Sequence, residues 1–214
     1  GNRMNRRMFI QRCGVGLTIL PLSGCRSSVF PVRSNTKPKK NPNILWIISE
    51  DTSPDMACYG NSIVQTPHLD QLASDGVRYT GAFASGPVCS AVRSGLMTGM
   101  YQTTIDAHNH RSHRTDGYRL PPPVELITEY FRRAGYFTSN AGNLDFSRAG
   151  KTDWNFDPGD TPFDGTDWRQ RRPDQPFFAQ INLQLTHRKF VRDKQHPIDP
   201  ASVEIPPYYP DHPL

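Results

Sequence analysis

Apolar and polar positions alternate between two kinds of pattern along this chain of 214 residues. Residues 44–48 form an uninterrupted apolar run, which predicts a strand buried on both faces of a parallel sheet. Segments 77–83, 136–139 and 177–183 are predicted to be further strands. Helical periodicity occurs between these runs, so the predicted fold class is α/β. The polar residues 143–175 are expected to be a long functional or disordered loop.

Three helices are predicted from the residues at their ends. The first is expected to begin at Pro67, after an N-cap threonine, and to end at Gly76. The second is expected to begin at Cys89 and to be closed by Gly99. The third follows three prolines at 121–123 and has apolar residues at helical spacing.

Two adjacent carboxylates, Glu50 and Asp51, directly follow the tip of the first predicted strand. In open α/β sheets, ligands bind at the carboxyl ends of the strands. Oxygen ligands of this kind favour Ca²⁺ or Mg²⁺ over softer metals. Glu50 and Asp51 are therefore the first candidates for ligands of a divalent cation, and the alternative is a pair of solvated acids.

A thiol and a guanidinium lie four residues apart, at Cys89 and Arg93, near the start of the second predicted helix. The unpaired N–H groups and the positive dipole end of a helix start favour a bound anion. A guanidinium adds a fork of donors that suits sulfate or phosphate. The alternative is a buried or disulfide-bonded cysteine, with Cys58 as its partner, on a helix whose arginine is exposed.

The same stretch contains Cys-x-Ala-x-Arg followed by Leu-x-Thr-Gly, which resembles the signature of the sulfatase family. Residues 42–48 and 66–70 resemble segments that recur in that family in the same order. The resemblance implies an alkaline-phosphatase-like α/β fold, with a mixed, mostly parallel sheet flanked by helices. Residues 43–214 are interpreted as the N-terminal part of the catalytic domain, incomplete at the C-terminus, because that domain is much longer in the family.

The resemblance also implies how the reaction begins. A maturation enzyme, formylglycine-generating or equivalent, would convert Cys89 to formylglycine, whose hydrate attacks the sulfur of a sulfate ester. Glu50 and Asp51 occupy positions where the family usually has two aspartates. Together with the converted Cys89 they are expected to bind Ca²⁺ or Mg²⁺, while Arg93 is expected to hold the hydrate in place.

Two residues further along the chain complete the implied site. Lys151 lies in a Gly-Lys pair that resembles the family's sulfate-binding lysine. His187 follows the last predicted strand in a Thr-His pair, and the resemblance implies that it protonates the leaving oxygen, a role that suits the pKa of histidine. The sequence departs from the family at Glu50, where aspartate is usual, and at Asp153, where histidine is usual.

The implied function is the hydrolysis of sulfuric esters, with a sulfated glycan or a small sulfate ester as substrate. One alternative is a truncated, non-catalytic surface lipoprotein that binds sulfated glycan. Another is a phosphatase or phosphodiesterase of the same superfold. That enzyme would need a Ser or Thr nucleophile and a two-zinc shell, and the sequence supplies no convincing pattern for either.

Charge is distributed unevenly along the chain, whose formal net charge is +5. Residues 1–40 hold nine Lys or Arg and no Asp or Glu, which leaves 16 bases against 20 acids in the rest. No nucleic-acid partner is therefore expected. The basic part is predicted to be an export leader, because Arg6 and Arg7 precede an apolar run too short to span a bilayer.

The end of this leader resembles a bacterial lipobox at residues 22–25. Residues 1–24 are predicted to be a signal peptide of the twin-arginine or lipoprotein type, and residues 25–42 a flexible tether. Lipidation of Cys25 would anchor the protein to a membrane, and an ordinary secretory leader is the alternative. The expected location is the periplasm or membrane surface of a bacterium.

Overall fold

The computed structural model describes residues 40–110, 116–188, 193–210 and 212. The predicted signal peptide and almost all of the predicted tether lie outside the described residues. The described residues belong to one compact unit that runs from residue 40 to residue 214. Among the described helices, none is long and apolar enough to cross a bilayer.

The strands are β1 (Ile44–Ser49), β2 (Phe137–Gly142), β3 (Asp145–Ala149) and β4 (Phe177–Leu183). The helices are α2 (Pro67–Asp75), α3 (Cys89–Thr98) and α4 (Ile127–Arg133), with short 3₁₀ turns η1 (Ala57–Tyr59), η2 (Trp168–Gln170) and η3 (Pro200–Ser202).

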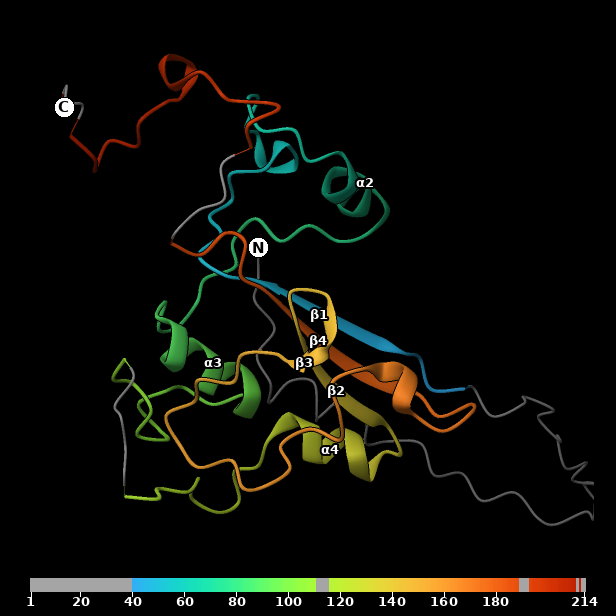
Figure 1. Ribbon diagram of the computed structural model, residues 1–214. Coiled ribbons are helices and arrows are strands. Elements are labelled where there is room, and N and C mark those ends of the chain that lie inside the picture. Colours follow the sequence, from blue (N-terminus) through green and yellow to red (C-terminus); the bar gives the residue numbers. More distant parts are fainter. Residues whose placement is uncertain (1–39, 111–115, 189–192, 211, 213–214) are drawn as a thin grey trace, which may run out of the picture. The chain divides into compact units, whose positions relative to one another are not determined.

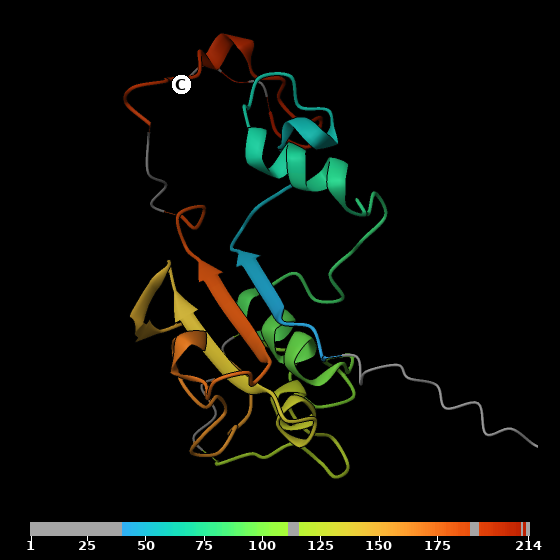
Figure 2. The ribbon, with the colours of Figure 1, turned by 90° about the vertical axis from the view of Figure 1, so that its right-hand side faces the viewer.

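The four strands form one sheet in the order β1-β4-β2-β3. Strand β4 is parallel to both β1 and β2, and β3 is antiparallel to β2, as the arrows in Figure 2 show. The prediction of a mixed, mostly parallel α/β sheet is therefore confirmed. Because the three parallel strands run the same way, their carboxyl ends meet at one edge of the sheet.

Helices α3 and α4 lie on the same face of this sheet (Figures 1 and 2). The core beneath them includes Phe178, which is 2% exposed and stacks on Phe131 of α4 with ring centroids 4.4 Å apart. A second apolar cluster contains Met97 of α3 and secures that helix. Its other buried members are Ile105, Ala107, Leu126 and Phe156. Aromatic stacking thus holds α4 against the sheet, and the apolar cluster packs α3 against the segments beside it.

Most predicted elements are present, and α2 and α3 begin and end at the expected residues. The expected N-cap of α2 is wrong in its chemistry, because the Thr66 side chain makes no capping hydrogen bond. Gly99 closes α3 with φ 67°, a left-handed conformation that glycine adopts without strain. The strands predicted at 44–48 and 177–183 are β1 and β4, and the one at 136–139 is the first half of β2. Helix α4 begins six residues after the first of the three prolines and ends before Gly135, whose φ is 86°.

Three expectations are wrong. Residues 77–83 form an irregular segment with a bend at residues 80–81 instead of a strand. Strand β1 is not buried on both faces, because Leu45 and Ile47, which share one face, are 50% and 54% exposed. It is also an edge strand, since within the described sheet it pairs only with β4. The segment 143–175 is not a plain loop, since it contains β3 and η2. Strand β3 has no apolar run in its sequence and arises from pairing with β2.

We expect Phe178→Ala to destabilise the fold by about 3–5 kcal/mol, because it removes a ring that is packed on both Phe131 and Trp46. Leu45→Ala, on the half-exposed face of β1, is the matched control and should cost less than about 1 kcal/mol. Urea unfolding monitored by circular dichroism measures both values. Equal losses for the two variants would show that the face covered by α3 and α4 is not the core.

Candidate active site

The ends of two neighbouring parallel strands bring distant parts of the sequence together. Strand β1 is followed directly by Glu50 and Asp51, and the turn after β4 carries His187. The backbone N–H of Glu50 donates to the carbonyl of Leu183 at 3.0 Å. The hydroxyl of Thr186 donates to the carbonyl of Glu50. These bonds place the acidic pair and the histidine at the same edge of the sheet.

A buried ion cluster surrounds the carboxylate of Glu50, which is 6% exposed. Its Oε1 lies 3.2 Å from Nη2 of Arg93 and accepts a hydrogen bond from Lys151. The Nζ of Lys151 also lies 3.6 Å from the carboxylate of Asp153. Arg93 is only 4% exposed, so the alternative of an exposed helix arginine is wrong.

The protonation of Glu50 reflects two opposing effects. Burial raises the pKa of this carboxyl, whereas the hydrogen bond from Lys151 and the charges of Arg93 and Lys151 lower it. The cations outweigh burial, so the pKa of Glu50 lies below its ordinary value. Glu50 is therefore a carboxylate at neutral pH.

Cys89 is the first residue of α3, one helical turn before Arg93. Its thiol and that of Cys58 are both free, so the structure does not form the alternative disulfide between them. The first N–H groups of a helix have no partner within the helix, and they surround the Cys89 position with donors. The thiol is half-buried, so it is accessible from the cavity that it lines.

Three predicted residues converge at this point. The ligand atoms of Glu50, Cys89 and His187 all lie within 4.8 Å of one another. His187 Nε2 is 3.6 Å from a carboxylate oxygen of Asp51, whose side chain is 47% exposed. Through Glu50, the cluster also includes Arg93 and Lys151. The structure thus brings together all six residues that the sequence nominated.

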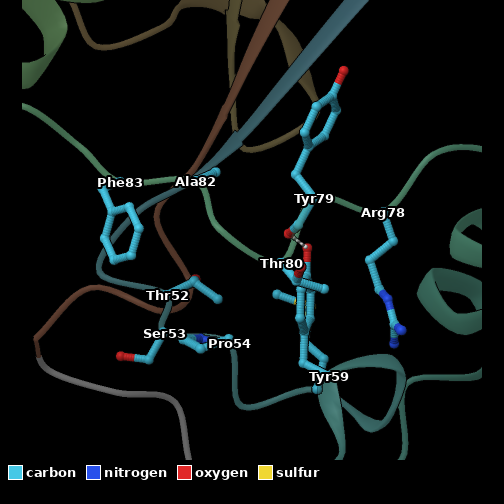
Figure 3. A pocket seen from close by; sticks show the side chains of 10 residues that line it. Thr52, Ser53, Pro54, Tyr59, Arg78, Tyr79, Thr80, Ala82 and Phe83 are labelled. Atoms are coloured by element: carbon cyan, nitrogen blue, oxygen red, sulfur yellow. Dashed lines mark hydrogen bonds between the residues drawn. The ribbon is translucent and has the colours of Figure 1, made fainter. Parts of the chain in front are cut away.

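Two adjoining cavities open at the site. The first, of about 400 Å³, is lined by Glu50, Asp51, Cys89 and Arg93. The second, of about 670 Å³, shares Thr52 and Ser53 with it and is shown in Figure 3. There the hydroxyl of Tyr59 donates to the carbonyl of Tyr79 at 3.2 Å, and Arg78 lies 5.7 Å from the Tyr59 ring centroid. The site therefore has space beside it for a group larger than a single tetrahedral anion.

The carboxylate oxygens at the site can be compared with the ligands that a divalent cation requires. Glu50 uses Oε1 for its two cationic partners, and within the described part of the chain its Oε2 accepts no hydrogen bond. The carboxylate of Asp51 follows in sequence and is partly exposed. Two carboxylates suit a hard cation, but Ca²⁺ takes about six to eight oxygen ligands. Glu50 and Asp51 therefore fit one part of a cation site.

Sequence reasoning missed the amide side chains that support this site. Arg93 Nη1 donates to Oδ1 of Asn182 at 2.5 Å, and Asn182 in turn contacts Asn140 and Gln180. The available signal was the presence of two amides at alternate positions in the otherwise apolar run 177–183. Polar residues in a predicted buried strand indicate a network that the strand must satisfy.

Comparison with known proteins decides the family. The sulfatase family model matches residues 42–213, which is most of the chain. The chain belongs to the sulfatase family. An ulvan-active sulfatase of Formosa agariphila is 36% identical over 157 residues, which cover 69% of this chain and 26% of that protein. An N-acetylgalactosamine-6-O-sulfatase of Bacteroides thetaiotaomicron is 32% identical over 146 residues, covering 65% of this chain and 28% of that protein.

A solved structure supports the sulfatase fold independently of close sequence similarity. That protein, in complex with its substrate D-glucosamine-2-N,6-O-disulfate, aligns with a TM-score of 0.50 at 19% identity. The alignment covers 72% of this chain and 36% of that protein, and it shows a shared fold. This chain spans 26% and 28% of the lengths of the two sulfatase relatives above.

We expect Glu50→Gln to destabilise the protein by about 3–5 kcal/mol at neutral pH, because it leaves the buried Arg93 and the partly buried Lys151 without their carboxylate. Since the folded-state pKa of Glu50 is lowered from 4.5, its contribution is complete above pH 4.5 and is lost as the pH falls through the folded-state value. The difference in unfolding free energy between wild type and Glu50→Gln should therefore shrink below pH 4.5.

Urea unfolding from pH 3 to pH 8 measures this difference. Other carboxyls also contribute to acid sensitivity, so only the difference between the two proteins reports on Glu50. Glu204→Gln, at an exposed position, is the matched control for the loss of one carboxylate. A pH-independent difference between wild type and Glu50→Gln would contradict the ion cluster.

Proposed function

We propose that this chain carries part of the active site of a sulfuric ester hydrolase that acts on sulfated glycans. The observation that carries the proposal is the convergence of Glu50, Cys89 and His187 within 4.8 Å, beside the buried Arg93 and the partly buried Lys151. Membership of the sulfatase family supports the reaction class. The proposal includes oxidation of Cys89 to formylglycine by a separate maturation enzyme that supplies the oxidant. In this step the residue loses its sulfur and two hydrogens and gains one oxygen.

Charge and donors in the cavity suit a sulfate group. Arg93 offers a planar fork of N–H donors, and Lys151 adds a second positive charge at the same carboxylate. Both side chains are held before substrate arrives, so little reorganisation is needed when charge develops on the sulfuryl oxygens. The converted Cys89, at the start of α3, supplies the nucleophile one turn from Arg93.

A divalent cation fits beside these residues. Glu50, Asp51 and the converted Cys89 would hold Ca²⁺ or Mg²⁺, which supplies charge neutralisation on the sulfuryl oxygens when it is bound. His187 lies beside this set, and its Nε2 is 3.6 Å from a carboxylate oxygen of Asp51. We assign it the proton that the leaving oxygen receives, because imidazole is the commonest general acid in enzymes and His187 lies beside Cys89.

The substrate class rests on the relatives and on the shape of the site. The names of two relatives refer to ulvan and to N-acetylgalactosamine. The second cavity, with Tyr59 and Arg78, adjoins the first and gives room for a sugar next to the sulfate. We propose in addition that residues 1–24 direct export, which would bring the enzyme to extracellular glycans.

Turnover of a sulfate ester should depend on Cys89. We expect Cys89→Ala to reduce hydrolysis of a chromogenic aryl sulfate, and of sulfated oligosaccharides, to the uncatalysed background. Cys58→Ala is the matched control, because that cysteine is also free and half-buried but does not line the Cys89 cavity. Mass spectrometry of peptides covering residues 85–100 should show loss of sulfur and two hydrogens and gain of one oxygen.

Different results would separate the alternatives. Protein from its native host that carries only the thiol at Cys89, and shows no turnover, contradicts the formylglycine mechanism. Binding of sulfated oligosaccharide that survives in Cys89→Ala, in a wild type without turnover, would instead indicate a binding protein. Hydrolysis of phosphate esters alone would indicate a phosphatase.

The proton donor has its own test. We expect His187→Ala to lower kcat for an alkyl sulfate about 10²-fold or more, because an alkoxide leaves poorly without a proton. For an aryl sulfate with a nitrophenol leaving group, which needs no proton, the loss should be much smaller. Steady-state kinetics with the two substrates measures the contrast, and equal losses would contradict the assignment.

A further inference from the structure

Three amide side chains lie buried in the sheet, at positions where parallel strands usually carry aliphatic residues. Asn140 of β2 and Gln180 and Asn182 of β4 are each no more than 3% exposed. Asn140 pairs in register with Gln180, and Asn182 is two residues further along, so the three share one face of the sheet. A buried amide is costly unless it is hydrogen-bonded, so the direction of these bonds indicates what the amide cluster does.

The hydrogen bonds of the amide cluster have a defined direction. Asn140 Nδ2 donates to the carbonyl of Gly150 at 3.0 Å, and a carbonyl only accepts. Asn140 therefore presents Oδ1 to Asn182, whose Nδ2 donates to it at 2.6 Å. This leaves Oδ1 of Asn182 facing Arg93, where it accepts from Nη1 at 2.5 Å. The orientation of the Asn182 amide is thus set, through two successive hydrogen bonds, by the backbone carbonyl of Gly150.

Gly150 makes this arrangement sterically feasible. A Cβ atom at Gly150 would lie 2.3 Å from Oδ1 of Asn140 and 2.6 Å from Nδ2 of Asn182. Both distances are far below van der Waals contact, so any other residue would push the amide pair apart. The glycine that precedes Lys151 therefore has a packing role in the amide cluster.

The two ends of the Arg93 guanidinium have different partners. Nη1 donates to the neutral amide of Asn182, and Nη2 faces the carboxylate of Glu50 at 3.2 Å. A carboxylate in place of Asn182 would neutralise the arginine a second time, whereas an amide orients it without adding charge. We propose that Asn182, supported by Asn140 and Gly150, is a positioning residue that orients Arg93 for an anion without adding a second negative charge to that of Glu50.

This inference rests on the proposed function only for the identity of the anion, which is sulfate. The test is NMR of the full chain labelled with ¹⁵N-arginine, combined with titration of inorganic sulfate. An ordered, hydrogen-bonded guanidinium rotates slowly, so Arg93 should show resolved Nη–H signals in the wild type. Asn182→Leu keeps the volume but removes the acceptor, and it should abolish these signals and weaken sulfate binding about tenfold.

Gly150→Ala supplies a second variant that changes no polar group. Its methyl should displace the amide pair and shift the Arg93 Nη–H signals, whereas Gly81→Ala, whose Cβ would meet nothing within 4 Å, should leave them unchanged. If Asn182→Leu does not fold, the wild-type spectrum and Gly150→Ala decide the question. Freely rotating Arg93 in the wild type, or wild-type signals and sulfate affinity in Asn182→Leu, would overturn the proposal.

The two proposals fail in different ways. The positioning role is supported if Arg93 is ordered in the wild type and released in Asn182→Leu, even if sulfate does not bind. In that case the proposed function fails and the positioning role stands. If the wild type binds sulfate but the order of the Arg93 guanidinium is the same in Asn182→Leu, only the positioning role is overturned.

Discussion

Glu50 is a carboxylate with little access to solvent, and such a group is tolerated only where cations lie against it. Arg93 of α3 and Lys151 of the segment after β3 meet this requirement. The three residues come from separate parts of the chain, so their contact ties β1, α3 and the β3 segment together. The placement of Cys89, one turn before Arg93, follows from the same contact.

The sheet topology explains why one edge of the molecule holds so many reactive groups. Strands β1 and β4 are parallel neighbours, and a candidate site residue follows the end of each, Glu50 after β1 and His187 after β4. The hydrogen bond from Thr186 to the carbonyl of Glu50 joins the two ends directly. A parallel sheet therefore concentrates groups that are more than a hundred residues apart in sequence.

The structure shows which side chains contact the two residues that depart from the family pattern, Glu50 and Asp153. Glu50, where aspartate is usual, contacts both Arg93 and Lys151 with one carboxylate oxygen. Asp153, where histidine is usual, lies 3.6 Å from Nζ of Lys151, so this lysine is placed between two carboxylates. The amide of Asn182 orients Arg93 without a further negative charge. Local charge near the sulfate-binding candidates is thus set by residues outside the signature motif.

The sequence by itself determined the fold class, most helix and strand positions and the six candidate residues, because apolar runs, caps and a specific motif are local signals. Segment 77–83 and strand β3 were predicted wrongly, since strand formation depends on a partner that the local pattern does not specify. Only the tertiary structure decided that Arg93 is buried, that both cysteines are free and that Asn182 holds the arginine. Those facts depend on which side chains meet across the sheet, and sequence spacing carries no information about such contacts.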